Sequence, residues 1–109
     1  MSDLFNPQAF AQLAQAEAGH WWFRSRNRLI LWVMQTKIEV FRNFMEVGCG
    51  TGFVLQGIQE TFPQTDLKGT EFFTEGLAFA QERVPTASFE QLDAREFGEN
   101  ENHDAIGAF

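Results

Sequence analysis

Residues 43–53 read NFMEVGCGTGF, and this stretch decides the fold. Its first five residues are mostly apolar and predict a short buried strand, 43–47, which runs into glycines at positions 48, 50 and 52. Residues 53–62 then predict a helix with apolar residues along one side and Pro63 as its stop. A glycine-rich turn between a strand and a helix lets the backbone approach a ligand closely, and the helix start offers unpaired N–H groups to a carboxylate or phosphate.

The alternation of strands and helices continues after this stretch. Further strands are predicted at 67–71, 88–92 and 104–109, with a loop or short turn over 94–103. A helix is predicted at 74–83, where Thr74 can cap its start and Glu75 lies near its positive end. Strands joined by helices require crossover connections, so the sequence predicts an α/β fold with a parallel sheet.

Two helices are predicted before the sheet. The first, to about residue 18, has Asn6 as a candidate cap, Pro7 at its first position and Gly19 as its stop. The second covers 21–37, where apolar residues recur at helical spacing. We therefore divide the chain into an N-terminal helical segment, 1–41, and an α/β segment, 42–109.

The last predicted strand, 104–109, is apolar enough to be a central strand buried on both faces. We therefore expect the sequence to be a piece of a longer protein. A strand without its neighbour exposes a row of unpaired N–H and C=O groups, so we also expect self-association through the edge of the fourth strand.

Composition narrows the possible partners and location. The 109 residues carry a net charge of −7, which disfavours direct binding to nucleic acid, and no apolar run approaches the length of a membrane span. The start of the chain lacks the features of a secretory signal and Cys49 is the only cysteine, so we expect a cytoplasmic protein with no membrane partner. Five of the eight basic residues fall between residues 24 and 42, as either a solvated helix face or a patch near an anionic ligand.

Acidic residues end two of the predicted strands. Glu71 ends the second strand, where a carboxylate can accept hydrogen bonds from both hydroxyls of a ribose. The same argument applies to nicotinamide cofactors, so Glu71 indicates an adenosine-type ligand without choosing among them. Phe72 and Phe73 follow at once, and one of them could pack on an adenine ring or serve only to fill the core. Asp93 ends the third strand.

The spacing of the glycines distinguishes two classes of cofactor site. Dinucleotide sites have G-x-G-x-x-G, whereas residues 46–52 have E-x-G-x-G-x-G. This pattern resembles motif I of class I S-adenosylmethionine-dependent methyltransferases. The strings QLDAR at 91–95 and NHDAI at 102–106 resemble later motifs of that family, and HWWFRSR at 20–26 resembles the segment before the core in methyltransferase type 11 and type 12 proteins.

The resemblance covers residues 20–109 and implies a Rossmann-like sheet of order 3-2-1-4, the N-terminal half of the S-adenosylmethionine-binding domain. It places Glu46 near the methionine amino group, the glycine turn along the methionine and ribose, and Asp93 and the next N–H against the adenine. With Glu71 on the ribose, the expected cofactor-binding residues are Glu46, Gly48, Cys49, Gly50, Gly52, Glu71, Phe72, Asp93 and Ala94.

No catalytic residue and no metal ligand is assigned from the sequence. Cys49 is interpreted as a small residue in a tight turn, because no histidine stands at a telling distance from it to activate a nucleophile. His20 is a weak candidate for a base. Trp21, Trp22 and Arg24 could cover the sulfonium and hold a carboxylate, or the two tryptophans could simply anchor a helix.

The resemblance therefore implies a methyltransferase that uses S-adenosylmethionine on a small-molecule acceptor, with the chain as given expected to be inactive alone. A non-catalytic binding or scaffold module is the alternative, because fold does not determine function. A nicotinamide-dependent oxidoreductase is a third possibility, which the glycine spacing disfavours.

Overall fold

The part of the chain that the structure describes forms one four-stranded parallel sheet with the order β3-β2-β1-β4. The computed structural model describes residues 7–38, 41–96 and 103–109. Within them the strands are β1 (Asn43–Val47), β2 (Asp66–Glu71), β3 (Ser88–Gln91) and β4 (Ala105–Gly107). Both the parallel sheet and the 3-2-1-4 order expected from the sequence are confirmed.

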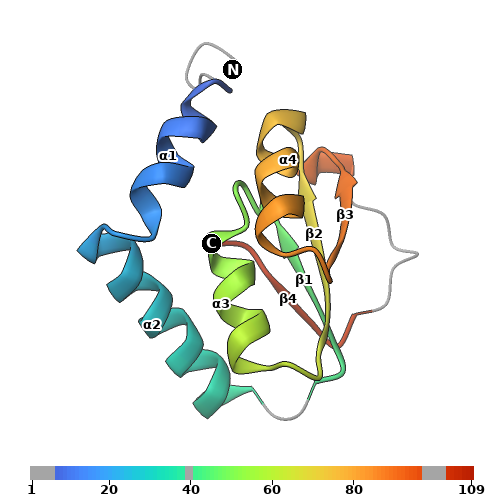
Figure 1. Ribbon diagram of the computed structural model, residues 1–109. Coiled ribbons are helices and arrows are strands. Elements are labelled where there is room, and N and C mark those ends of the chain that lie inside the picture. The colour runs from blue at the N-terminus through green and yellow to red at the C-terminus, as the bar shows by residue number, and fades with distance from the viewer. Residues whose placement is uncertain (1–6, 39–40, 97–102) are drawn as a thin grey trace.

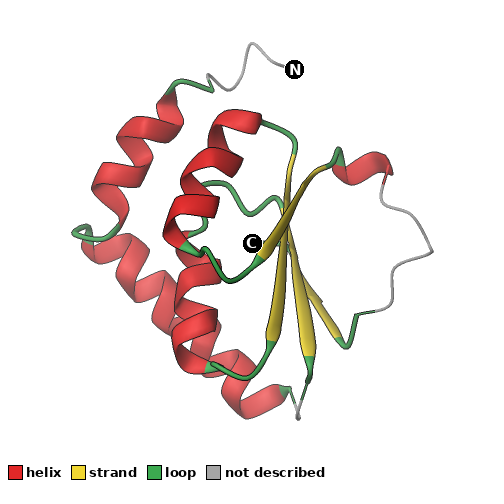
Figure 2. Cartoon of the chain, turned by 45° about the vertical axis from the view of Figure 1, so that its right-hand side comes forward, coloured by secondary structure: helices red, strands yellow, loops and turns green. Residues whose placement is uncertain are grey.

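Four α-helices accompany the sheet and lie on one side of it (Figure 2). They are α1 (Ala9–Glu17), α2 (Trp21–Lys37), α3 (Phe53–Thr61) and α4 (Thr74–Arg83). In Figure 1 the two N-terminal helices form an arm along α3 and α4, and α1 packs against α4 while α2 packs against α3. A short 3₁₀ helix, Ala94–Glu96, follows β3.

The core lies between the helices and the sheet. Phe44 of β1 and Leu55 and Ile58 of α3 are almost completely buried there, and Met34 of α2 joins the same cluster. Each such side chain contributes about 1.5–3 kcal/mol on removal from water. The packing fixes α3 over β1, and so fixes where the glycine turn between them emerges.

Two details of the helices differ from the sequence prediction. Thr74 does not cap α4; it is the first helical residue, and Phe73 takes the cap position without a side-chain bond. The chain turns one residue early because the Phe73 N–H donates to the Glu71 carboxylate. Helix α1 begins at Ala9 with Gln8 before it, so Pro7 is not the first helical residue as predicted; the expected cap, Asn6, lies outside the described residues.

The helix at 21–37 is confirmed, but most of the apolar residues that indicated it do not face the core. Met34 is buried, and Ile30 and Leu31 pack beside it. The other side of α2 exposes several large apolar side chains, namely Trp21, Trp22, Leu29, Trp32 and Val33. No helix of the described residues is long and apolar enough to cross a bilayer.

The fourth strand is shorter than predicted, three residues within 104–109, and it lies at the edge of the sheet. Among the described residues its one strand neighbour is β1. Ile106 is half exposed there, so β4 in this structure is not the doubly buried strand that its composition suggests. The division of the chain at residue 41 stays a prediction.

Candidate functional site at the carboxyl end of the sheet

The glycine turn leaves the carboxyl end of β1 and crosses toward β2. Its three glycines, Gly48, Gly50 and Gly52, all have positive φ angles, of 72°, 55° and 83°. The N–H of Cys49 donates to the Thr70 carbonyl at 2.8 Å, which ties the turn to the neighbouring strand. Gly52 then starts α3, where its left-handed conformation and its close approach to Ala80 of α4 leave no room for a side chain.

Glu71 lies beside this turn, as the ribose hypothesis requires. One carboxylate oxygen accepts from the Gly50 N–H at 2.9 Å, and the other accepts from the Phe73 N–H at 3.1 Å. The side chain is about nine-tenths buried. Two backbone N–H groups therefore orient a carboxylate at the tip of β2, next to the residues that the motif identified.

Glu46 is the more deeply buried acid, with 2% of its surface exposed. Its atom Oε1 has no hydrogen-bond partner. Burial raises the pKa of this carboxyl from 4.5 to about 8, against the opposing effect of Arg26 and with smaller contributions from Glu71 and Glu17. At neutral pH Glu46 therefore retains its proton until a positive group lies next to it.

Cys49 is buried inside the turn as a free thiol. Burial, and then the negative charges of Glu46 and Glu71, raise the pKa of the thiol to about 12. A thiol in that state is a poor nucleophile, because the thiolate is the reactive form. This agrees with the structural role predicted for Cys49.

The end of β3 lies next to the end of β2. The Leu92 N–H donates to the Glu71 carbonyl at 3.1 Å, and the Gln91 side chain donates to the Phe72 carbonyl at 2.9 Å. Asp93 follows directly, so the structure places it at the same end of the sheet as Glu71 and the glycine turn.

The Asp93 carboxylate is already bonded within its own turn. It accepts from the backbone N–H of Arg95 at 2.9 Å and from the guanidinium of Arg95 at 2.6 Å. The side-chain hydrogen bond from Arg95 is the main reason that the pKa of Asp93 falls to about 2. Arg95 is itself 88% exposed, so the group that covers Asp93 is a surface side chain and not the interior of the protein.

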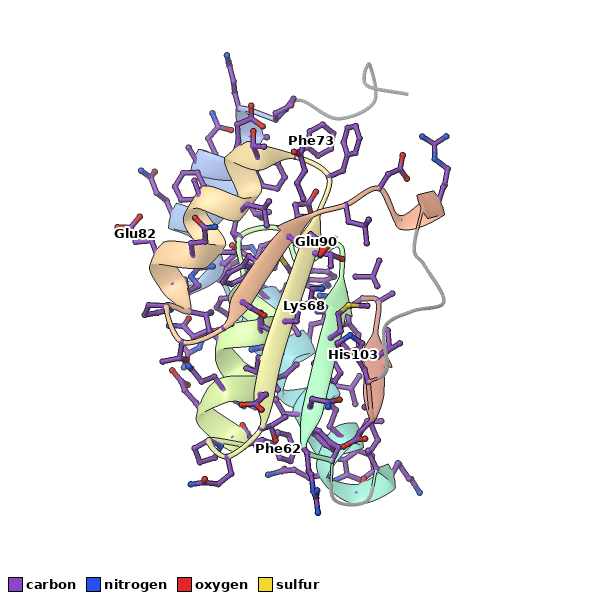
Figure 3. All side chains as sticks on the ribbon, turned by 90° about the vertical axis from the view of Figure 1, so that its right-hand side faces the viewer. Phe62, Lys68, Phe73, Glu82, Glu90 and His103 are labelled. Atoms are coloured by element: carbon purple, nitrogen blue, oxygen red, sulfur yellow. The ribbon has the colours of Figure 1, made fainter. Side chains whose placement is uncertain are left out.

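The two phenylalanines at the tip of β2 have different environments. Phe73 is half-buried and contacts Phe10 of α1, with ring centroids 5.9 Å apart, so it fills space under the helices. Phe72 is 52% exposed and meets Phe73 edge-on at 5.2 Å. Phe72 is therefore the more exposed of the two rings, and its contact with an adenine stays a prediction. Figure 3 shows Phe73 at this end of the sheet and Phe62 at the opposite end.

Other residues singled out in the sequence have structural contacts. His20 caps α2, with Nδ1 accepting from the Trp22 N–H at 3.2 Å. Asp104 accepts from the Arg42 N–H at 2.8 Å and links the start of β4 to the start of β1. Arg26 lies over the ring of Trp22 at 5.7 Å. Ala94 begins the 3₁₀ helix after Asp93 and is exposed.

The candidate site at the carboxyl end of the sheet is located by its polar groups. A hollow of about 540 Å³ lies elsewhere, lined by Ile38, Phe41 and Phe62 near the amino ends of the strands. Ligands of open parallel sheets bind outside the carboxyl ends of the strands, and the oriented polar groups of this chain lie there. We therefore place the candidate site by its polar groups and not by the size of a hollow.

Sequence reasoning missed Thr51 within the turn and two residues of other helices that bond to it, Glu17 and Arg83. The hydroxyl of Thr51 donates to Glu17, and Arg83 donates to both. They are 32 to 66 residues apart in sequence, so no local pattern connects them. The only local signal was Thr51 between two motif glycines.

Comparison with solved structures identifies the architecture. CalS10 of Micromonospora echinaspora, an amino pentose methyltransferase with bound S-adenosylmethionine, superposes with a TM-score of 0.71 at 24% identity, over 96% of this chain and 42% of CalS10. The sugar N-methyltransferase KedS8 of Streptoalloteichus sp. ATCC 53650 gives 0.64 at 23%, over 100% and 39%. The fold is that of S-adenosylmethionine-dependent methyltransferases.

DesVI of Streptomyces venezuelae matches the same methyltransferase fold with a TM-score of 0.72 at 22% identity, over 96% of this chain and 43% of DesVI. The chain thus spans less than half the length of these three neighbours. Neither the profiles of known protein families nor the curated proteins contain a match. The family resemblance stated from the motifs is confirmed at the level of the fold.

Proposed function

We propose that this chain forms the cofactor-binding part of an S-adenosylmethionine-dependent methyltransferase that acts on a small molecule. The observation that carries the proposal is the pair of bonds that hold Glu71, from Gly50 in the turn and from Phe73 beyond β2. They orient a carboxylate beside the glycine turn, where a ribose that follows the turn would meet it.

The remaining assignments follow the shape of the ligand. Glu46, buried and with an unpartnered oxygen, would accept the methionine ammonium, which would favour the ionised form of the carboxyl. Phe72 would cover one adenine face, and Asp93 with the Ala94 N–H would bind the adenine edge once Arg95 releases the carboxylate. Gly48, Cys49, Gly50 and Gly52 would line the methionine and ribose.

None of these groups performs the chemistry. The cofactor supplies a methyl group that its positive sulfur has already activated, and the protein has to bind it, align an acceptor and exclude water. The chain spans less than half the length of its structural neighbours. Methyl transfer by the whole protein, and the small-molecule acceptor, are therefore proposed. Sugar methyltransferases among the neighbours support a small-molecule acceptor. We propose a cytoplasmic location, where the free thiol of Cys49 would persist.

Titration calorimetry with S-adenosylhomocysteine tests the proposal. We expect saturable binding by the wild-type chain, and Glu71→Gln should weaken it about ten-fold or more because an acceptor of charge-assisted bonds is lost. Glu82→Gln, which changes an exposed acid on α4, is the matched control and should bind as the wild type does. Binding of NADH instead of S-adenosylhomocysteine would contradict the proposal, and binding of neither would favour the scaffold alternative.

We also propose that the side of β4 away from β1, which has no strand neighbour among the described residues, pairs with a second copy of the chain. Ile106 and Phe109 are each about half exposed at this edge. The backbone N–H and C=O groups of an edge strand can pair with a strand of another chain. Sedimentation velocity over a range of concentrations should show a dimer. A monomer at the highest concentration would contradict this contact without affecting the cofactor site.

A further inference from the structure

Helix α1 is bonded to the glycine turn through three polar side chains from three parts of the chain. Oε1 of Glu17, at the end of α1, accepts from the Thr51 hydroxyl and from Nη1 of Arg83, the latter at 3.1 Å. The same Nη1 lies 3.1 Å from the Thr51 oxygen. Glu17 is 6% exposed and Thr51 2%. We call these residues the Glu17–Thr51–Arg83 cluster.

The Arg83 side chain also bonds to the backbone of α1. Its Nη2 donates to the Ala14 carbonyl at 3.0 Å, close to one helical turn before Glu17. Its guanidinium also lies 5.5 Å from the centre of the Phe53 ring, at the start of α3. One side chain therefore joins the end of α4, the body of α1 and the start of α3. Because this ion pair is largely shielded from water, loss of one partner matters more than at an exposed pair.

The other end of α1 contacts the same turn by apolar packing. Phe10 is 4% exposed, and its ring lies against Gly50 in the turn and Gly76 in α4. It also contacts Phe73, whose N–H holds Glu71. Helix α1 thus supports the turn at Gly50 through Phe10 and at Thr51 through Glu17.

Thr51 is the residue of the turn whose side chain forms hydrogen bonds with residues of other helices. On one side of it, the Gly50 N–H donates to Glu71; on the other, Gly52 starts α3 in a left-handed conformation. Glycines move easily between backbone conformations, so a turn with three of them needs an external constraint to keep one shape. The hydroxyl of Thr51, bonded to two residues outside the turn, supplies such a constraint in addition to the backbone bonds of Cys49 to Thr70 and of Gly50 to Glu71.

We infer that Glu17 and Arg83 are positioning residues for the cofactor: through Thr51 they hold the Gly50–Gly52 turn in the shape that binds the ligand. The inference rests on the proposed function and extends the site to a helix outside the motif. A pre-organised turn binds more tightly because ordering it costs nothing at the moment of binding.

Two substitutions of Thr51 separate positioning from stability. Thr51→Val keeps the shape but removes the hydroxyl, and should raise the Kd for S-adenosylhomocysteine about ten-fold. Thr51→Ser keeps the hydroxyl and should restore the Kd to within about two-fold of the wild type. Ile58→Val, in the core of α3 away from the cluster, lowers stability without touching the turn and should leave the Kd unchanged.

A second measurement needs no ligand. In the free protein, Glu17→Gln and Arg83→Gln should each speed hydrogen exchange of the Gly50 and Gly52 amides, and the effects should be less than additive in the double variant, because the two side chains are bonded to each other and to the same hydroxyl. A wild-type Kd in Thr51→Val overturns the inference and leaves the proposed function standing. If the wild type does not bind S-adenosylhomocysteine, the proposed function fails, and unchanged exchange at Gly50 and Gly52 then overturns the inference as well.

Discussion

The candidate site contains acids from the ends of three strands. The acids of β1 and β2 are buried, whereas the acid that follows β3 is bonded to a surface side chain. Glu46 and Glu71 are buried, and backbone N–H groups hold Glu71 beside the glycine turn. Asp93, after β3, is held by a single exposed arginine that lies two residues away. Burial raises the pKa of Glu46 to about 8, whereas the bonds from Arg95 lower that of Asp93 to about 2.

The difference shows which half of the site is built in advance. Around β1 and β2 the polar groups are fixed by backbone bonds and by packing from α1 and α3, so a ligand meets them already oriented. At β3 a ligand has to displace Arg95 before Asp93 can accept from it, and that exchange offsets part of the gain. We therefore expect the methionine and ribose end of the ligand to contribute more affinity than the adenine end.

The largest loss of stability expected from a substitution is at Gly52, where the turn packs most closely against α4. Gly52→Ala places a Cβ 3.0 Å from the Ala80 Cα at a φ of 83°, so strain and overpacking should lower the free energy of unfolding by about 2–4 kcal/mol. Gly48→Ala is the matched control: its φ is 72°, but nothing lies within 4 Å of the new Cβ. Gly48→Ala should lower the free energy of unfolding only by the cost of holding alanine in a left-handed conformation, about 1–2 kcal/mol. Equal losses in urea unfolding would show that the turn is not packed as described.

The next prediction tests the burial of Glu46. Its pKa in the folded chain is above the ordinary 4.5, so the folded state keeps a proton that the unfolded state releases. The free energy of unfolding should therefore fall as pH rises from about 4.5 to about 8, by roughly 4 kcal/mol in all, and Glu46→Gln should abolish this fall. Glu82→Gln, at an exposed position, should keep the wild-type profile. A flat wild-type profile would contradict the buried, unpartnered state.

The smallest effect concerns the β3 half. Arg95→Gln removes the main partner of Asp93, so the pKa of that carboxyl should rise from about 2 toward its ordinary value of 3.8. Because the Arg95 side chain is 88% exposed, the midpoint of urea unfolding should hardly change. Carbon NMR of the Asp93 carboxyl during an acid titration measures this. A value that stays near 2 would show that a fixed group, and not Arg95, holds Asp93.

The sequence predicted the parts of the fold and site that local patterns encode. The glycine spacing located the turn, and the strand–helix alternation predicted the parallel sheet that brings Glu71 and Asp93 to one end of it. The Glu17–Thr51–Arg83 cluster depends on how α1 and α4 pack against the turn, and the raised pKa of Glu46 depends on its burial, and no short pattern contains either. The exposed face of α2 was hidden for the same reason, because helical spacing identifies a helix but not which of its sides the fold covers.

The hydrogen bonds of the Asp93 carboxylate could not be predicted from the sequence either. Its position after a strand suggested an acid free to bind a ligand, but the following turn folds the side chain of Arg95 back onto it. Whether an arginine two residues away points back or outward depends on backbone angles that the sequence does not state.

Amide NMR during titration with S-adenosylhomocysteine tests most directly whether the carboxyl ends of β1, β2 and β3 form one ligand site. The largest shifts should fall on the Gly50, Phe73 and Ala94 amides, with those of Gly50 and Phe73 exceeding that of Ala94, since the β1–β2 half is already oriented. Shifts confined to the opposite end of the sheet, around Phe41 and Phe62, or no shifts at saturating ligand, would contradict the account.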